Sequence, residues 1–149
     1  MPQNQGRSFE DCPFCRIATG TVASYEVFRD SVSMAFLDKR PLFKGHCLLI
    51  PLTHSETLLD LPQGLVAPLF SNARLLASAI EIGLEAEGTF IAINNKISQS
   101  VPHLHIHIVP RRHGDGLKGF FWPRTKYISE EEASETRNVI ASALSRLNS

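Results

Sequence analysis

The sequence predicts an α+β fold, with a mainly antiparallel sheet, one long central helix and a C-terminal helix. Three observations predict it. Short β-prone segments recur along the chain, one long segment between them has helical spacing, and a second helical pattern follows near the end. The 149 residues, of which 43% are hydrophobic, are enough for a single domain, 1–149, with its own core.

The predicted strands are short apolar runs between polar or turn residues. They are EVFRD (26–30), SVSMAFLD (31–38), HCLLI (46–50), FIAIN (90–94) and HLHIHIV (103–109). Pro51 ends the third run, because proline cannot donate a hydrogen bond to a neighbouring strand. Strands therefore lie on both sides of the long helical segment in the chain.

The long helix is predicted between residues 61 and 86, where leucine and isoleucine recur at helical intervals. The recurring residues are Leu65, Leu69, Leu76, Ile80 and Leu84. Pro62 suits the first turn, and Gly88 lies just beyond the expected end. The C-terminal helix is predicted from Ser129 at the N-cap, acidic residues in the first turn and Arg146 near the end.

The N-terminal segment, the apolar stretches and the net charge indicate which class of protein to expect. Residues 1–11 are expected to form a loose tail without the features of a signal peptide, and no apolar stretch approaches a membrane span. The net charge of zero gives no argument for nucleic acid or a membrane as partner. A cytoplasmic protein is expected, in which the three cysteines are thiols or metal ligands.

Three of the six histidines alternate in HLHIHIVP at 103–110. Successive side chains of a strand point to opposite faces, so His103, His105 and His107 are expected to share one face. The row could be a polar surface stripe or a metal site, since neutral imidazoles are common ligands. It could also serve nucleophilic catalysis, because an imidazole can attack phosphorus and form a covalent intermediate. The residues alone leave the second and third interpretations open.

HLHIHIV resembles the signature of the histidine triad family, in which histidines alternate with hydrophobic residues. The resemblance covers roughly residues 12–112. It includes FLD at 36–38, GHCLLIP at 45–51 and SQSV at 98–101, so four separate motifs agree with the family. The resemblance implies the family's α+β fold, a nucleotide substrate and a homodimer.

The resemblance also implies roles for individual residues. His105 corresponds to the nucleophile that attacks the α-phosphate, and the carbonyl of His103 orients its ring. His107 would contact phosphate oxygens or the leaving group, and His46 corresponds to the histidine facing the triad. The polar residues Asn94, Gln99 and Ser100 match positions on the phosphate side. Each of these three could instead be an ordinary loop or strand-end residue.

The nucleoside half of the substrate is assigned in the same way. Asp38 corresponds to the family's ribose-binding acid, which accepts from both hydroxyl groups. Phe14, Ile17 and Phe36 match the apolar walls of the base pocket, although core packing would explain them as well. Lys39 departs from the family, where the residue after the ribose acid is often apolar. This departure leaves the base preference open.

Cys12 and Cys15 form a CPFC motif, which is weak evidence by itself because CxxC is also a redox motif. No βαβ unit of the kind found in thioredoxin follows it. The motif is similar to the zinc-bearing branch of the histidine triad superfamily. That resemblance implies a structural zinc ion held by Cys12, Cys15, His54 and His103. Cys47 alternates with His46 and is interpreted as a small buried hydrophobe.

A basic, aromatic segment precedes the C-terminal helix, so that residues 111–149 comprise this segment and the helix. RRHGDGLKGFFWPRTKY at 111–127 is interpreted as a flap over the substrate or a dimer contact, in preference to a site for single-stranded nucleic acid. A loop packed by its own aromatic residues is the simpler alternative.

The expected function is that of a hydrolase or nucleotidyl transferase acting on a nucleoside phosphoramidate or a dinucleoside polyphosphate. A nucleotidyl-His105 intermediate would form, and its transfer to water or another acceptor would release a nucleoside monophosphate. Two alternatives remain: a nucleotide-binding regulatory module with negligible turnover, and a protein whose histidines only bind metal.

Overall fold

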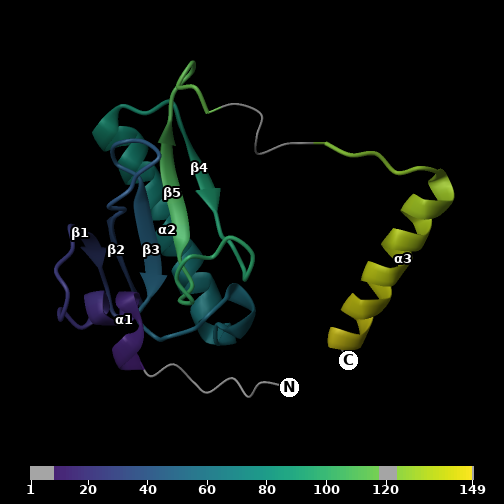
Figure 1. The fold of residues 1–149 in the computed structure, drawn as a ribbon, viewed down its shortest axis with the longest axis horizontal. Coiled ribbons are helices and arrows are strands. Elements are labelled where there is room, and N and C mark those ends of the chain that lie inside the picture. Colours follow the sequence, from purple (N-terminus) through teal and green to yellow (C-terminus); the bar gives the residue numbers. More distant parts are fainter. Residues whose placement is uncertain (1–8, 118–123, 149) are drawn as a thin grey trace. The chain divides into compact units, whose positions relative to one another are not determined.

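The computed structural model describes residues 9–117 and 124–148 of the chain. Contacts divide the chain into two compact units, Met1–Asp115 and Gly116–Ser149 (Figure 1). The first unit carries the sheet and the second the C-terminal helix, so the single domain expected from the sequence stays a prediction. Most of the predicted N-terminal tail lies outside the described residues, and Phe9–Asp11 form a short 3-10 turn.

The first unit is built on a five-stranded antiparallel sheet with the order β1-β2-β3-β5-β4. The strands are β1 (Glu26–Arg29), β2 (Ser33–Leu37), β3 (Cys47–Pro51), β4 (Gly88–Ala92) and β5 (Ile106–Arg111). The central pair, β3 and β5, comes from distant parts of the chain, with Leu48 opposite His107. This pairing brings the GHCLLIP segment beside the triad and confirms the predicted fold class.

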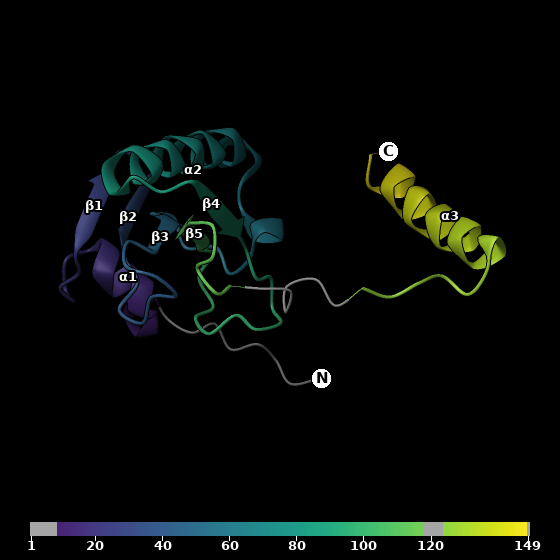
Figure 2. The same cartoon turned by 90° about the horizontal axis from the view of Figure 1, so that it is seen from above.

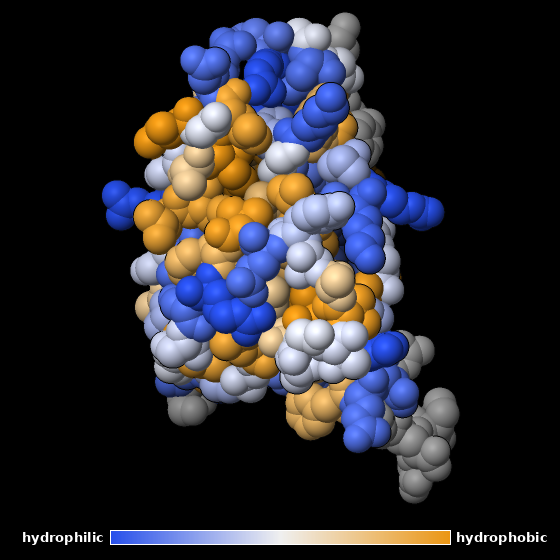
Figure 3. Space-filling model, turned by 90° about the vertical axis from the view of Figure 1, so that its left-hand side faces the viewer, coloured by the Kyte–Doolittle hydropathy of each residue, from blue (hydrophilic) through white to orange (hydrophobic). Residues whose placement is uncertain are grey.

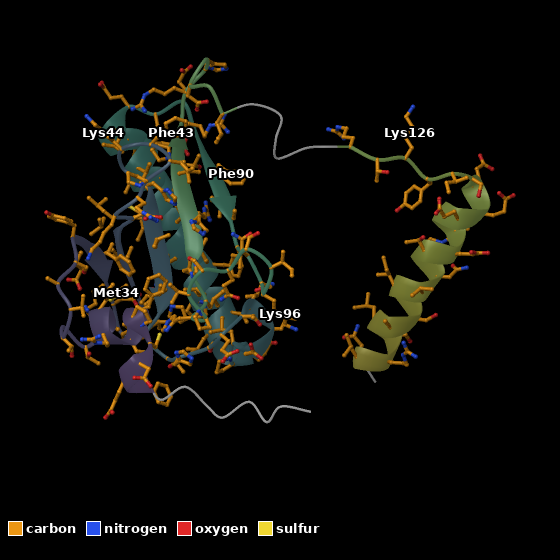
Figure 4. The ribbon with its side chains drawn as sticks, in the orientation of Figure 1. Met34, Phe43, Lys44, Phe90, Lys96 and Lys126 are labelled. Atoms are coloured by element: carbon orange, nitrogen blue, oxygen red, sulfur yellow. The ribbon has the colours of Figure 1, made fainter. Side chains whose placement is uncertain are left out.

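Helix α2 (Gln63–Leu84) covers one face of the sheet, and the short helix α1 (Pro13–Ala18) lies on the opposite face (Figure 2). Under α2 the core contains Leu49, Leu69, Leu76, Ile80, Leu104, Ile106 and Ile108. Under α1 it contains Phe14, Ile17, Met34, Phe36, Leu48 and Ile50. Met34, labelled in Figure 4, is 1% exposed in this second cluster. Both faces of the sheet are therefore covered.

The limits of α2 differ slightly from the prediction. Pro62 occupies the N-cap position, and the helix ends at Leu84 with Glu85 in the left-handed region at φ 53°. Gly88 begins β4 and has no part in ending the helix. By length and composition α2 could span a membrane, contrary to the expectation that no segment approaches one. Its buried face packs on the sheet, so α2 is the core helix of the unit.

The strand predicted at 103–109 begins three residues later, at Ile106. The backbone of the preceding residues bonds to loops, with Leu104 N–H donating to Ser55 O at 2.7 Å. The alternation nevertheless persists. Leu104, Ile106 and Ile108 all pack in the core under α2, which leaves the opposite face to the histidines.

The second unit contains helix α3 (Glu130–Leu147). The Ser129 side chain accepts a hydrogen bond from Glu132 N–H, three acidic residues lie in the first turn, and Arg146 lies in the last. These features confirm the predicted helix and its N-cap.

Gly45 sets the path of the chain immediately before His46. Its φ of +97° is one that L-residues rarely adopt, and an added Cβ would lie 2.2 Å from Cδ1 of Leu84 at the end of α2. The turn at residue 45 and the end of α2 therefore constrain one another.

We expect Gly45→Ala to lower the free energy of unfolding by about 1–3 kcal/mol, through backbone strain and contact with Leu84. Gly83→Ala is the control, because a Cβ at this helical position would meet nothing within 4 Å. That change should be neutral or stabilise by up to about 1 kcal/mol. Urea unfolding measures both, and an unchanged or higher stability of Gly45→Ala would contradict the assignment.

Candidate functional site

The structure brings the predicted histidines together between β3, β5 and α1. His46, His103 and His105 are 3%, 0% and 4% exposed, and His107 is half-buried. The edge of the Phe14 ring meets His105, with ring centroids 5.1 Å apart. The histidines thus form a buried row with an aromatic residue of α1 packed against it, and they are not a surface stripe.

The hydrogen bond of His105 determines which of its ring nitrogens is free. His105 Nδ1 lies 2.7 Å from the carbonyl oxygen of His103. Because a carbonyl only accepts, Nδ1 must carry the hydrogen, and in the neutral ring Nε2 holds the lone pair. His105 also lines the large cavity beside α1. The arrangement can present a nucleophilic nitrogen to a ligand in that cavity.

A second chain of hydrogen bonds orders His46 and His107. The backbone N–H of Leu42 donates to His46 Nδ1 at 3.1 Å, so the hydrogen of the neutral His46 ring is on Nε2. His46 Nε2 lies 3.0 Å from His107 Nδ1, which must therefore accept. The hydrogen of His107 is then on Nε2. His107 also lines the cavity, where this arrangement gives it a donor and not a base.

Burial favours the neutral forms of His46, His103 and His107 by lowering their pKa values. Desolvation, followed by the neighbouring His105 and His46, lowers the pKa of His107 to about 4. Desolvation also lowers the pKa of His103 to about 4, against the opposing effect of its bond to Pro51. Burial lowers the pKa of His46 too, although Asp38 favours its charged form. The hydrogen positions assigned to His46, His103 and His107 are therefore those of neutral rings.

The cavity beside α1 has a volume of about 340 Å³. Phe14, Ile17 and Phe36, which were predicted to form the walls of a base pocket, line it together with Asp38 and Ser100. Figure 3 shows apolar residues gathered on the side of the molecule that carries β1 and α1. The cavity thus combines apolar walls with an acid, a hydroxyl and two histidines, a composition that suits a small polar ligand.

Two of the three residues predicted on the phosphate side, Gln99 and Asn94, do not line this cavity. The Gln99 amide donates to the carbonyl of Glu56, and its oxygen accepts from Lys96 N–H. Asn94 is exposed and is absent from the cavity lining. Three polar lining residues were missed: Arg16, Ser24 and Tyr25. No sequence signal marked them, because α1 was not predicted and residues 19–25 form no regular element.

The four predicted metal ligands also converge. Nδ1 of His103 lies 3.4 Å from Cys12 Sγ, 3.5 Å from Cys15 Sγ and 3.2 Å from His54 Nδ1. Cys15 Sγ lies 3.2 Å from His54 Nδ1. Tetrahedral zinc would separate such ligands by about 3.3–3.8 Å, so the residues fit a zinc ion. Without a cation, desolvation and then Cys12 raise the pKa of Cys15 to about 12.

The ring of His103 is turned correctly for a ligand. Its Nε2 donates to the carbonyl of Pro51 at 2.9 Å, which leaves the lone pair of Nδ1 directed toward the two thiols. Ligand histidines commonly use their second nitrogen in this way. Cys47 lies on the other face of β3, under α2, and burial raises its pKa to about 11.

Asp38, His46 and His107 form a second group with metal-ligating side chains. His46 Nε2 lies 3.7 Å from Asp38 Oδ2. A metal on that nitrogen would move the ring hydrogen to Nδ1, where it would oppose the N–H of Leu42. The hydrogen bonds therefore favour a chain of donors and acceptors over a metal centre.

The basic, aromatic segment at 111–127 is described only in part. Arg111 and Asp115 form an ion pair, with Nε and Oδ2 2.6 Å apart, that closes the turn after β5. The aromatic residues at 120–122 lie outside the described residues, so the predicted flap or dimer contact stays a prediction.

The chain is similar in sequence to known proteins. A family model described as the HIT domain matches residues 20–114. Protein hit of Bacillus subtilis is 36% identical over 143 residues, covering 94% of this chain and 97% of that protein. An adenosine 5′-monophosphoramidase of Saccharomyces cerevisiae is 33% identical, covering 75% of this chain and 70% of that protein. An adenylylsulfatase of Arabidopsis thaliana is 35% identical, covering 72% of this chain and 55% of that protein.

Solved structures agree with the fold. A Streptococcus mutans protein matches with a TM-score of 0.83 and 31% identity, covering 94% of this chain and 89% of that one. A zinc-bound histidine triad family protein from Mycobacterium smegmatis matches with a TM-score of 0.69 and 36% identity, covering 92% and 98%. Because the family model spans well over half of the chain and these relatives align along most of it, the chain belongs to the HIT, or histidine triad, family.

Proposed function

We propose that this protein is a nucleotide hydrolase or nucleotidyl transferase that acts at the α-phosphate of a nucleoside phosphoramidate or dinucleoside polyphosphate. One observation carries the proposal: His105 Nδ1 is committed to the carbonyl of His103, so Nε2 offers its lone pair at the cavity. The relatives named as a phosphoramidase and an adenylylsulfatase support phosphorus chemistry on a nucleotide.

The first step forms a bond between His105 Nε2 and the α-phosphorus, while the bond from phosphorus to the leaving group breaks. The leaving amine or phosphate takes up a proton. The proton comes from solvent water, because a neutral imidazole and a hydroxyl are weak acids. His107, with a hydrogen on Nε2, and Ser100 line the cavity and donate hydrogen bonds that stabilise the departing group. Attack by water, or another acceptor, then breaks the phosphorus–nitrogen bond and releases the nucleotide.

The rest of the nucleotide is assigned to the same cavity. The base lies between the apolar walls formed by Phe14, Ile17 and Phe36, and Asp38 accepts from the ribose hydroxyls. Gln99 makes its proposed phosphate contact only if the loop at 95–102 rearranges, because its amide is bonded to Glu56 and Lys96 here. The phosphate contact of Asn94 is proposed from the resemblance to the family alone.

We further propose that Cys12, Cys15, His54 and His103 hold a structural zinc ion. The distances among their donor atoms and the orientation of His103 support it, as does the zinc-bound relative. When bound, zinc would supply a cross-link between the start of α1, the loop after β3 and the residues before β5. The side chains proposed to perform the chemistry lie outside this cluster. The cluster is linked to them through the backbone carbonyl of His103, which accepts a hydrogen bond from His105.

A homodimer in the cytoplasm completes the proposal. Leu75 and Ile82 on α2 are 57% and 81% exposed, and Ile91 on the edge strand β4 is 46% exposed. Apolar side chains on an outer helix and an edge strand support a subunit contact. A sedimentation mass of one chain at micromolar concentration would rule the dimer out.

One experiment distinguishes the proposed enzyme from a nucleotide-binding regulatory module and from a protein that only binds metal. We expect His105→Ala to lower the release of monophosphate from adenosine phosphoramidate or diadenosine polyphosphates by about a thousandfold or more, because the nucleophile is lost. His113→Ala is the matched control, since His113 is exposed and pairs with Glu87 away from the cavity.

Equal rates for wild type and His105→Ala would sink the nucleophile assignment. Binding of nucleotide by the wild type without turnover would instead identify a regulatory binding module. Activity that chelation abolishes but His105→Ala leaves intact would identify a metal-dependent protein. A transient mass increase of one nucleotidyl group, absent from His105→Ala, would support the covalent intermediate.

We expect one zinc ion per chain in freshly purified protein, measured by mass spectrometry of the metal. Cys12→Ser should remove it and lower the melting temperature by several degrees, because the cross-link is lost. His46→Ala should keep one zinc, since the second group of side chains is ordered as a hydrogen-bond chain. Zinc-free wild-type protein with the melting temperature of Cys12→Ser would refute the metal site.

The neutral state of His107 should make stability depend on pH. Its pKa falls from 6.5 to about 4 on folding, so the unfolded chain binds more protons between these values. Stability from this residue is complete above pH 6.5 and is lost as the pH falls toward 4. His107→Gln should therefore lose less stability than wild type between pH 7 and 4.5, by about 1–2 kcal/mol after allowance for solvent screening. Urea unfolding at both pH values measures the two losses. An equal loss of stability in wild type and His107→Gln would contradict this.

A further inference from the structure

We propose that Arg16 makes the nucleotide cavity prefer guanine over adenine. The inference deepens the proposed function, because it names the base of the substrate that the same site takes. The cationic side chain of Arg16 lines the cavity and has no role in the proposed chemistry.

Arg16 lies on α1 next to Ile17 and two residues after Phe14, which are the proposed base walls. Within residues 9–117 and 124–148, its side chain makes no ion pair or hydrogen bond. Arg29, the next arginine along the chain, is instead held by Glu26 and by the carbonyl of Ala18. The Arg16 guanidinium is therefore available to a ligand at the α1 side of the cavity.

The other polar groups that line this part of the cavity discriminate poorly between bases. The hydroxyls of Ser24 and Tyr25 can each donate or accept, so they suit either purine. Lys39 is a single point charge beside Asp38, at the proposed ribose site. Arg16 differs from them because its guanidinium offers paired donors in a fixed planar geometry.

This geometry matches one purine. Guanine presents two adjacent acceptors, N7 and O6, and a guanidinium can donate to both at once. Adenine presents the acceptor N7 beside an amino group that is itself a donor, so one of the two contacts becomes donor against donor. Aromatic walls such as Phe14 and Phe36 offer apolar contact to either base and leave the choice to the polar contact. Bidentate pairs of this kind discriminate roughly 5- to 150-fold.

The experiment compares kcat/KM for guanosine and adenosine 5′-phosphoramidates. Wild type should favour guanosine by about fivefold or more. Arg16→Ala should bring the ratio close to one, mainly by lowering the rate with guanosine. Arg16→Gln should favour adenosine, because a carboxamide pairs with N6 and N7 of adenine. Arg74→Gln, an exposed site on α2 outside the cavity lining, removes the same charge and should keep the wild-type ratio.

A wild-type ratio of one would overturn the inference and leave the proposed chemistry standing. Arg16→Ala lowering both rates equally would also overturn it, since Arg16 would then neutralise phosphate and not read the base. Calorimetric binding of GMP and AMP to His105→Ala, with and without Arg16→Gln, gives the same comparison without turnover. If the wild type turns over neither phosphoramidate, the result counts against the proposed function. The binding of GMP and AMP would still decide the base preference.

Discussion

The site depends on three hydrogen-bonding groups of one buried residue, His103. Its Nε2 donates to the carbonyl of Pro51, its Nδ1 faces two thiols and His54, and its own carbonyl accepts from His105. These contacts join the end of β3, the proposed zinc cluster and the proposed nucleophile. A displacement of this residue would therefore alter the metal geometry and the orientation of His105 together. Complete burial makes the arrangement rigid, because any unpaired ring nitrogen would carry the full cost of desolvation.

Burial also determines the chemistry that the histidines can perform. In water, each ring would gain a proton near pH 6.5 and exchange freely between its two neutral forms. Here the pKa values of His103 and His107 fall to about 4. The carbonyl of Pro51 selects one form of the His103 ring, and the His46 side chain, itself ordered by Leu42 N–H, selects one form of the His107 ring. The same histidine type thus suits the proposed roles of ligand, nucleophile or donor according to the hydrogen-bond partner that each ring meets. The backbone of β3 and of the residues before β5 supplies most of these distinctions.

The fold and the central histidines were predictable because they follow from local periodicity. Alternation placed His103, His105 and His107 opposite Leu104 and Ile108, and helical spacing located α2 to within two residues at each end. The start of β5 was missed, since it depends on whether a partner strand is within reach and not on β-propensity. The hydrogen bond from Leu42 to His46 was also invisible, because it depends on a turn that Gly45 makes possible. The roles of Asn94 and Gln99 were carried from the family, and the contacts of Gln99 with Lys96 and Glu56 depend on a loop conformation that has no periodic pattern in the sequence.

Helix α1 links the proposed metal cluster to the choice of substrate. Its six residues are too few to form a stable helix alone, so its position depends on tertiary contacts. Cys12 caps its first turn, with Sγ accepting from Cys15 N–H, and both cysteines face His103. The next side chains, Phe14, Arg16 and Ile17, line the cavity that is proposed to bind the nucleotide. A zinc ion bound to the cysteines would thereby position the residues that are proposed to contact the base. It would take no part in the bonds that form and break in the proposed reaction. On this proposal the metal acts through the position of α1, while the proposed chemistry uses only imidazole, water and substrate.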